Sequence, residues 1–307
     1  MAIAQQIKAR RTTGWQLDRR WRAAAPYVFI SPFYIIFLTF GLLPILFSLV
    51  VSVFDWRGTT PGGYVGLTNY RILLNDPSFY KALFNTVYIW VGSVPTMIFL
   101  ALIFAVILNS RLVRFRGLFR TLYFLPVVTS LLIAGLIFSL LFSTSFGLVN
   151  RILDPLGIGP INWLADPNWM KVTLILALLW RWIGNDVVLM LAGLQQIPTD
   201  LYEAAKVDGA SEMQTLWHIT VPLMRPVILF DAIISTIGAF NLFAEPFALF
   251  GPGGGIEQSG LVTGTLLYQY AFVYFKFGYG SALAWVLAMV IFALSMIQLR
   301  LGNRSVD

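Results

Sequence analysis

The chain has 307 residues, of which 58% are hydrophobic and only 11% are charged, and it contains no cysteine. A soluble domain would carry about twice that share of charged residues, so the composition indicates a polytopic α-helical membrane protein. The absence of thiols excludes disulfides, thiol catalysis and thiolate metal sites, and the single histidine, His218, excludes a histidine-based metal cluster or catalytic triad within the chain. The net charge of +7 indicates contact with anionic lipid rather than with nucleic acid, because the basic residues cluster at the ends of apolar runs.

Six apolar runs are long enough to cross a bilayer, for which about 20 residues suffice. We therefore expect an all-α membrane protein with six transmembrane helices, at residues 27–54, 82–109, 121–142, 171–194, 223–250 and 280–301. This pattern divides the chain into a basic tail, a first helix with its loop, a five-helix core and a short C-terminal tail, at residues 1–25, 26–81, 82–302 and 303–307.

Six spans place both ends of the chain on the same side of the membrane. The basic tail, the connection around residue 115, the loop around residue 205 and the C-terminal end together hold fourteen Lys and Arg residues, whereas the three opposite loops hold six. Cytoplasmic loops carry the excess of basic residues. We therefore expect both ends, and the polar connection between the fourth and fifth spans, to be cytoplasmic.

This polar connection, residues 198–222, has the sequence PTDLYEAAKVDGASEMQTLWHITVP. Its first half predicts a short helix that begins with a capping box formed by Asp200 and Glu203. Gly209 is expected to take the left-handed conformation that ends this helix, and Asp208 suits the turn before it.

The second half of the connection predicts another short helix. Ser211 with Gln214 repeats the capping-box pattern, and apolar residues follow at helical spacing. Pro222 either ends this helix or opens the next span. A helix–turn–helix that lies on the membrane with one apolar face is shaped to be held by a partner outside the bilayer.

Polar residues inside the fourth and fifth spans form a second candidate site. Charged side chains are costly in a bilayer, so they usually face a partner or a water-filled cavity. The residues concerned are Trp180, Arg181, Asn185 and Asp186 in the fourth span and a stripe of Asp231, Ser235, Gly238, Asn241 and Glu245 in the fifth.

Two interpretations of these residues stay open. They could be structural, by forming interhelical pairs or by reaching the membrane interface, or the two helices could line a polar passage. Aromatic and amide side chains suit a neutral, hydroxyl-rich solute. We favour the passage and expect it to be lined by Trp180, Arg181, Asn185, Asp186, Asn241 and Glu245.

Residues 251–255, GPGGG, are glycine-rich but lack the GK[ST] sequence of phosphate-binding loops. They also fall on the side that we expect to be external, so we interpret them as a flexible external loop. No pair of carboxylates has the spacing that hydrolysis requires, which argues against an enzyme.

Within residues 198–222, the pattern E-A-A-x3-G-x9-I-x-V-P resembles the EAA loop of ABC importer permeases. One position departs from the family, which more often has Leu where this chain has Val221. The stretches LAGLQQIP (191–198) and FNLFAEPFALFGPGGG (240–255) are similar to the carbohydrate-uptake branch, in particular to its maltose-, lactose- and arabinose-oligosaccharide-type subunits. The resemblance extends roughly over residues 25–302.

The resemblance implies one permease subunit of a binding-protein-dependent sugar importer in a bacterial or archaeal cytoplasmic membrane, working by ATP-driven alternating access. In that family the EAA loop is the coupling helix that docks on a cytoplasmic ATPase subunit. The coupling residues would be Glu203, Ala204, Ala205, Asp208, Gly209, Ile219 and Pro222.

The same resemblance implies the partners. These would be a second permease in a heterodimer, two ATPase subunits, an extracytoplasmic binding protein that delivers a di- or oligosaccharide, and membrane lipid. The chain itself would hold no cofactor, because ATP and Mg bind to the ATPase.

Two alternatives stay open. The same machinery could carry another polar solute such as glycerol phosphate, although a phosphate would favour more cations than Arg181 alone. The chain could instead be an ion-coupled secondary sugar transporter that uses Asp186, Asp231 or Glu245 as relay groups, but this would leave the EAA-like loop unexplained.

Overall fold

The computed structural model describes residue 21 and the ranges 23–110 and 116–303. Within these residues all regular elements are helices, and strand-like pairing is limited to three isolated bridges. The all-α class predicted from the sequence is therefore confirmed. The basic residues of 1–20, Arg22, the connection 111–115 and the tail 304–307 lie outside the described part of the chain.

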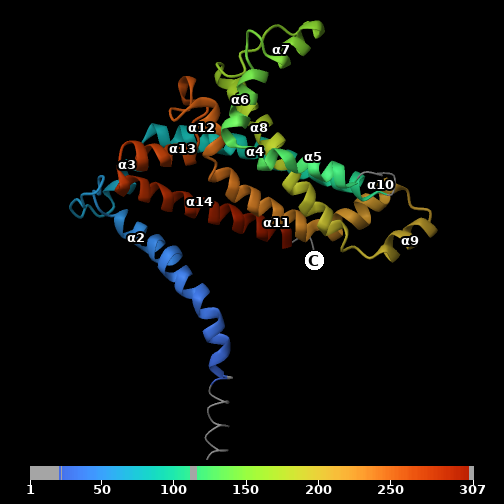
Figure 1. Cartoon of the computed structure of the whole chain (residues 1–307), viewed down its shortest axis with the longest axis horizontal. Coiled ribbons are helices and arrows are strands. Elements are labelled where there is room, and N and C mark those ends of the chain that lie inside the picture. Colours follow the sequence, from blue (N-terminus) through green and yellow to red (C-terminus); the bar gives the residue numbers. More distant parts are fainter. Residues whose placement is uncertain (1–20, 22, 111–115, 304–307) are drawn as a thin grey trace, which may run out of the picture.

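Four long helices lie together along the long axis of the molecule (Figure 1). They are α4 (Pro77–Asn109), α8 (Pro167–Leu194), α11 (Val221–Phe240) and α14 (Phe277–Asn303).

Helices α4 and α8 begin in the same way, with the dipeptide Asp-Pro. Asp76 and Asp166 are the N-cap residues, and each accepts a hydrogen bond from an N–H of the first turn, at 2.8 Å and 2.9 Å. Proline suits the first helical position because its missing N–H is not needed there. Both helices therefore start a few residues ahead of the predicted spans.

The third predicted span, 121–142, is not one straight helix. Helices α5 (Arg116–Val128) and α6 (Leu131–Leu141) meet at an angle of 99°. Pro126 cannot donate a hydrogen bond to the preceding turn, and Ser130 has an extended ψ of 137°, so the helix breaks between them. Helix α6 turns away from the bundle, and α7 (Leu148–Leu153) lies beyond it (Figure 1).

Small residues allow the helices of the bundle to pack closely. Ala101 and Ala105 of α4 are fully buried in a cluster with Val187 of α8. Helix α5 crosses α8 at Gly184, where a Cβ atom would lie 1.9 Å from the carbonyl oxygen of Tyr123. In a membrane this close packing is a main source of helix association, since lipid is as apolar as the side chains.

The prediction of a single helix over 223–250 is wrong. Helix α11 ends at Phe240, and the chain resumes as a separate helix, α12 (Ala244–Phe250), after Phe243 departs from helical geometry with φ −134° and ψ −48°. At its other end α11 continues from α10 (Glu212–Thr215) through a π-helical turn, η3 (Leu216–Thr220). One helical rod of 29 residues therefore runs from Glu212 to Phe240; Pro222 lies within it, in the first turn of α11, and does not end the helix.

The first long helix, Ala23–Val51, leaves the bundle (Figure 1). It includes the π-helical η1 (Phe37–Leu42) and α2 (Leu43–Val51). Trp285 Nε1 donates to Ser48 Oγ at 3.2 Å and so ties its end to α14, but only 6% of its most apolar window is buried. The sides of this helix are therefore available to lipid or to another protein.

The connection from α12 to α14, which begins with the glycine-rich residues 251–255, folds back onto α4. It contains η4 (Ile256–Gln258), α13 (Thr263–Tyr268) and η5 (Gln269–Val273). Leu261 and Val262 are fully buried, and Asn85 Nδ2 donates to the carbonyl oxygens of Gln258 and Leu261, both at 2.9 Å. The sequence did not predict this buried part, because its main partner lies far away in the chain; a flexible external loop at residues 251–255 stays a prediction.

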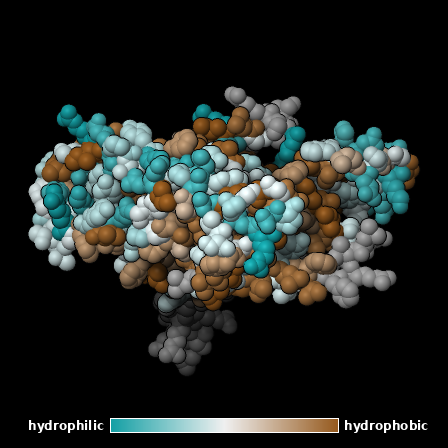
Figure 2. All heavy atoms as spheres, turned by 90° about the horizontal axis from the view of Figure 1, so that it is seen from above, coloured by the Kyte–Doolittle hydropathy of each residue, from teal (hydrophilic) through white to brown (hydrophobic). Residues whose placement is uncertain are grey.

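Five of the described helices are long and apolar enough to cross a membrane, and the bent pair α5–α6 makes a sixth if it counts as one span. Figure 2 shows hydrophilic side chains at the two ends of the long axis, and a mixture of hydrophobic and hydrophilic ones between them on this face. One end carries α3 (Thr68–Leu73), and the other carries α9 (Thr199–Val207) and α10 (Figure 1). The length and composition of these helices are those of a multi-pass membrane protein.

Candidate functional site

The first candidate site is the connection between α8 and α11. Helix α9 ends at Asp208, its C-cap, and Gly209 follows with a φ of +74°. Ala210 N–H donates to the carbonyl of Ala205 at 2.9 Å and Gly209 N–H to that of Lys206 at 3.2 Å, which is the Schellman arrangement. The predicted left-handed turn at Gly209 is confirmed.

The capping box predicted for Asp200 and Glu203 is wrong. Pro198 occupies the N-cap position of α9, and no side chain caps the helix there; Asp200 falls inside the first turn, too late to act as N-cap. Glu203 and Ala204 are exposed, whereas Ala205 is buried. Glu203 therefore presents its carboxylate to the surroundings and has no capping role.

The capping box predicted for the second helix is confirmed. Ser211 N–H donates to Gln214 Oε1 at 2.8 Å, and Gln214 N–H donates to Ser211 Oγ at 3.3 Å. The two short helices are also tied together, because the hydroxyls of Tyr202 on α9 and Thr220 before α11 lie 3.2 Å apart. The connection is thus a folded element held on the end of the bundle.

The outer surface of this element suits a protein partner. A hollow of about 390 Å³ is lined by Asp208, Gly209, Ala210, Gln214, Thr215, His218 and Ile219, so it brings three of the predicted coupling residues together. Large apolar side chains stand exposed around it, including Val207 (87% exposed), Met213 and Trp217. Exposed apolar groups rimmed by polar ones are typical of interaction sites.

The second candidate site is a cavity of about 490 Å³ inside the bundle. Its polar and aromatic lining comes from α4, α8, α11, the break before α12 and α12 itself, as Ser93, Arg181, Trp182, Asn185, Asp186, Ser235, Asn241, Phe243 and Glu245. The volume lies within the range of pockets for small organic ligands, roughly 300–1,000 Å³. Five of the six residues proposed for the passage therefore meet in one cavity.

Trp180 does not line this cavity. Its ring packs against Phe138 of α6, with centroids 5.5 Å apart, in the apolar cluster that includes Trp163. The aromatic residues that line the cavity are Trp182 and Phe243. Sequence reasoning missed Ser93 and Met97 of α4; the serine within an otherwise apolar run was the available signal.

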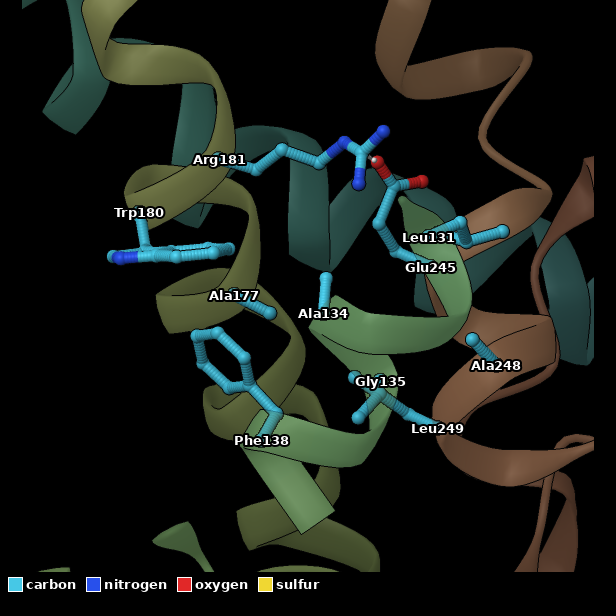
Figure 3. A pocket seen from close by; sticks show the side chains of 10 residues that line it. All are labelled: Leu131, Ala134, Gly135, Phe138, Ala177, Trp180, Arg181, Glu245, Ala248 and Leu249. Carbon is cyan, nitrogen blue, oxygen red and sulfur yellow. Dashed lines mark ion pairs between the residues drawn. The ribbon is translucent and has the colours of Figure 1, made fainter. Parts of the chain in front are cut away.

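An ion pair forms part of the lining of this cavity, and Figure 3 shows the same pair in a much smaller pocket that it also lines. Arg181 Nε lies 3.3 Å from Glu245 Oε1, and Trp182 Nε1 donates to the same oxygen at 3.1 Å. Glu245 belongs to α12 and is 7% exposed. The predicted polar stripe along one helix is therefore wrong for Glu245, because the break before α12 carries it out of the α11 face.

Two more carboxylates are buried between α8 and α11. Asp186 is 3% exposed and Asp231 is 1% exposed, and each has an Oδ2 atom without a hydrogen-bond partner among the described residues. Nearby, Thr236 Oγ1 receives hydrogen bonds from Trp90 Nε1 and Gln298 Nε2, both at 2.8 Å. These bonds join α4, α11 and α14 close to the cavity.

A carboxylate ties the helices together at the end that carries α3. Asp76 Oδ2 accepts hydrogen bonds from the hydroxyls of Tyr270 at 2.8 Å and Tyr279 at 2.7 Å. Burial raises the pKa of Asp76, but the hydrogen bonds from Tyr279, Tyr270 and Ser78 together outweigh it, so the pKa lies below its usual value. Burial and the bond to Asp76 raise the pKa of Tyr270 to about 12.

No group of three or more His, Cys, Asp or Glu side chains in the described ranges could hold a metal ion. One site is a polar cavity among helices, which could bind a solute. The other is an exposed element at the end of one of these helices, which could bind a protein partner.

Comparison with known proteins gives consistent matches along the chain. Residues 23–305 match the family described as binding-protein-dependent transport system inner membrane component. The arabinooligosaccharides transport system permease protein of Bacillus subtilis (strain 168) is 39% identical over 301 residues, which cover 96% of this chain and 94% of that protein. The lactose transport system permease protein of Rhizobium radiobacter is 39% identical over 290 residues, covering 94% and 97%.

A more distant relative is the trehalose/maltose transport system permease protein of Thermococcus litoralis, 34% identical over 283 residues and covering 90% of this chain and 93% of that protein. Among solved structures, a bacterial alginate ABC transporter in complex with an alginate pentasaccharide-bound periplasmic protein has a chain with a TM-score of 0.78 and 24% identity, covering 93% of this chain and 98% of that chain. This likeness concerns the fold.

Proposed function

Because the chain belongs to the family of binding-protein-dependent transport system inner membrane components, a family of transport subunits whose ATP is hydrolysed by a separate ATPase, we propose that it moves a neutral di- or oligosaccharide into the cell by ATP-driven alternating access. The observation that carries this proposal is the continuous helix Glu212–Phe240. It begins in the exposed connection and ends in the wall of the polar cavity, so a displacement of the connection would be transmitted along this helix to the cavity.

The cavity has the chemistry of a sugar site. The indole of Trp182 offers an apolar face, while amides such as Asn185 and Asn241 both donate and accept hydrogen bonds. Arg181 is paired with Glu245, so no isolated cation is presented to a phosphate. The relatives named for arabinooligosaccharides, lactose and trehalose/maltose support a di- or oligosaccharide as cargo, and glycerol phosphate fits this lining less well.

The connection has the features of a coupling element. Glu203 would pair with a basic residue of the ATPase, Ala204 and Ala205 would permit close approach, and Gly209 would hold the bend. Asp208 and Ile219 would line the contact, and Pro222 would lie within the rod that carries the movement inward. The hollow lined by Asp208, Gly209 and Ile219 supports this assignment.

Six spans with both ends in the cytoplasm of a bacterial or archaeal cell put this element on the ATPase side of the membrane. One coupling element serves one ATPase, so a second permease is needed for the other, and we propose a heterodimer. The scarcely buried helix Ala23–Val51 supports such a neighbour. The sugar-binding protein would dock at the opposite end, on residues 55–81, 143–170 and 251–279.

An ion-coupled transporter with Asp186, Asp231 or Glu245 as relay groups is set aside, because the chain belongs to a binding-protein-dependent transport family. These carboxylates then need no relay role, and proton-linked uptake without an ATPase would bring that alternative back.

Affinity purification in mild detergent tests the proposal. We expect the wild-type chain to bring with it a second permease and an active ATPase, and Glu203→Lys to lose the ATPase because like charges would meet at the contact. Glu257→Lys is the matched control, since Glu257 is exposed near the opposite end of the bundle, and it should retain the ATPase. Loss of the ATPase in neither variant, or in both, would contradict the coupling role of Glu203.

A further inference from the structure

The ion pair of Arg181 and Glu245 lies between two cavities of very different size. One, enclosed by α6, α8 and α12, has a volume of about 10 Å³, which is no more than the space for one water molecule. The other is the 490 Å³ cavity, and both residues line it as well. Figure 3 shows Arg181 reaching across from α8 with its guanidinium next to the carboxylate of Glu245. The smaller cavity has no room for a sugar, whereas the large one does, so a sugar would meet this pair in the large cavity.

The pair sets the charge that a solute meets there. Among the residues that line the large cavity, Arg181 is the one cation, and Asp186 and Glu245 are the acids. The charge of Arg181 is offset by Glu245 at 3.3 Å. An acidic sugar brings a carboxylate, which needs a charged or strongly polar donor once it leaves water. The cavity offers it no unpaired cation.

Stability alone does not account for this pair. Arg181 Nη1 is buried without a hydrogen-bond partner among the described residues, and Glu245 Oε1 is shared between Arg181 and the indole of Trp182. A buried ion pair with unsatisfied donors is no more stabilising than apolar side chains of similar volume. A role in selecting solutes explains why two charges stand at the wall of the cavity.

We propose that Glu245 is a specificity-determining residue that keeps Arg181 neutralised, so that the cavity accepts neutral sugars and rejects acidic ones. This inference rests on the proposed transport of a sugar. Without the negative charge of Glu245, the guanidinium would be free to bind a sugar carboxylate through charge-assisted hydrogen bonds. One such bond changes binding by about tenfold or more.

The test compares a neutral sugar with its own acid. The probes are the neutral disaccharide that the wild-type importer takes up and its aldonic acid, such as lactose with lactobionate or maltose with maltobionate. Competition binding is measured on the assembled importer in nanodiscs without the binding protein, whose own selectivity would otherwise intervene. Glu245→Gln keeps the length of the side chain and an oxygen that can accept from Trp182, and it should shift the preference toward the acid by about tenfold or more.

The double variant Arg181→Gln/Glu245→Gln is the matched control. It also lacks the ion pair but exposes no cation, so its preference should stay with the neutral sugar. An unchanged preference in Glu245→Gln, or an equal gain for the acid in the double variant, overturns the proposal.

Arg181→Gln gives an independent test if Glu245→Gln does not assemble. It leaves the carboxylate of Glu245 unpaired, so we expect a gain of about tenfold or more for the cationic disaccharide of glucosamine over its neutral N-acetylated form; no gain overturns the proposal. Failure of the transport function looks different, because the wild-type importer with binding protein and ATP would then take up no neutral disaccharide into proteoliposomes.

Discussion

Substitutions at Gly209 can separate the conformational energy of a left-handed backbone from steric contact between a new side chain and its neighbours. Its φ of +74° lies in the left-handed region, and a Cβ atom there would meet nothing within 4 Å inside this chain. A substitution therefore costs only the conformational energy of an L-residue, about 1–2 kcal/mol for alanine or valine. Asparagine tolerates the left-handed region and should cost much less.

This cost acts on the geometry of the coupling element. A change of about 1.4 kcal/mol alters an equilibrium tenfold, so a Val at position 209 should reduce the population of the correct turn by about that factor. We expect ATP-dependent uptake in proteoliposomes to fall in the order Gly209, Gly209→Asn, Gly209→Ala, Gly209→Val, with all variants inserted and equally abundant.

Two results would refute this reasoning. Normal uptake by Gly209→Val would show that the turn is not needed for coupling. Equal damage by Asn and Val would show that a side chain of any kind collides with the partner, so that backbone strain is not the cause.

Further predictions concern stability and orientation. Asp76→Asn should lower the thermal midpoint in detergent, because a neutral amide replaces the carboxylate that accepts from Tyr270 and Tyr279. The pKa of Asp76 is lowered on folding, so its carboxylate stabilises the folded state only where it is ionised. The difference in thermal midpoint between the variant and wild type should therefore be fully present above the unfolded pKa of about 3.9 and shrink as the pH falls through the lower folded pKa. A difference that grows in acid would contradict this. Asn85→Leu should lower the free energy of unfolding by about 2–4 kcal/mol, because two buried carbonyl groups lose their donor, whereas Asn75→Leu, at an exposed hydrogen bond, should cost less than about 1 kcal/mol. Similar losses in the two variants would mean that burial of these carbonyls is unimportant. Because the chain contains no cysteine, Ile158→Cys and Met213→Cys each carry a single thiol; an impermeant maleimide should label the first in right-side-out vesicles and the second in inside-out vesicles of membranes that contain this chain alone, and the reverse labelling would overturn the proposed orientation.

Local signals in the sequence predicted the turn of the coupling element well. Gly209 and the Ser211–Gln214 box depend on residues within a few positions of each other, so their chemistry can be recognised without the fold. The false capping box at Asp200 shows the limit of the same approach, because the pattern does not say which residue becomes the N-cap. Here Pro198, two residues earlier, starts the helix.

Hydropathy located the long helices but not their breaks. The run 223–250 is apolar on average, and its polar stripe fits one continuous helix; Pro246 was a local signal of weakened helix geometry, but it does not place the break at Phe243. Because of this break, Glu245 lies on a separate helix, α12, and pairs with Arg181 from there. In the same way, the burial of Leu261 depends on Asn85, 176 residues away, and such a distant contact leaves no local pattern.

The length of the rod from Glu212 to Phe240 determines how far its inner end moves when its exposed end is tilted. At 1.5 Å per residue its 29 residues span about 43 Å, so a tilt of roughly ten degrees at the exposed end displaces the far end by about 7 Å. Its compliant stretch lies close to the exposed end, where the π-helical turn is followed by Pro222 and Pro226, which cannot donate to the backbone ladder. Beyond Pro226 the rod is a regular helix. A tilt that is transmitted through the compliant stretch therefore moves this part as a rigid body, and the wall of the cavity moves with it.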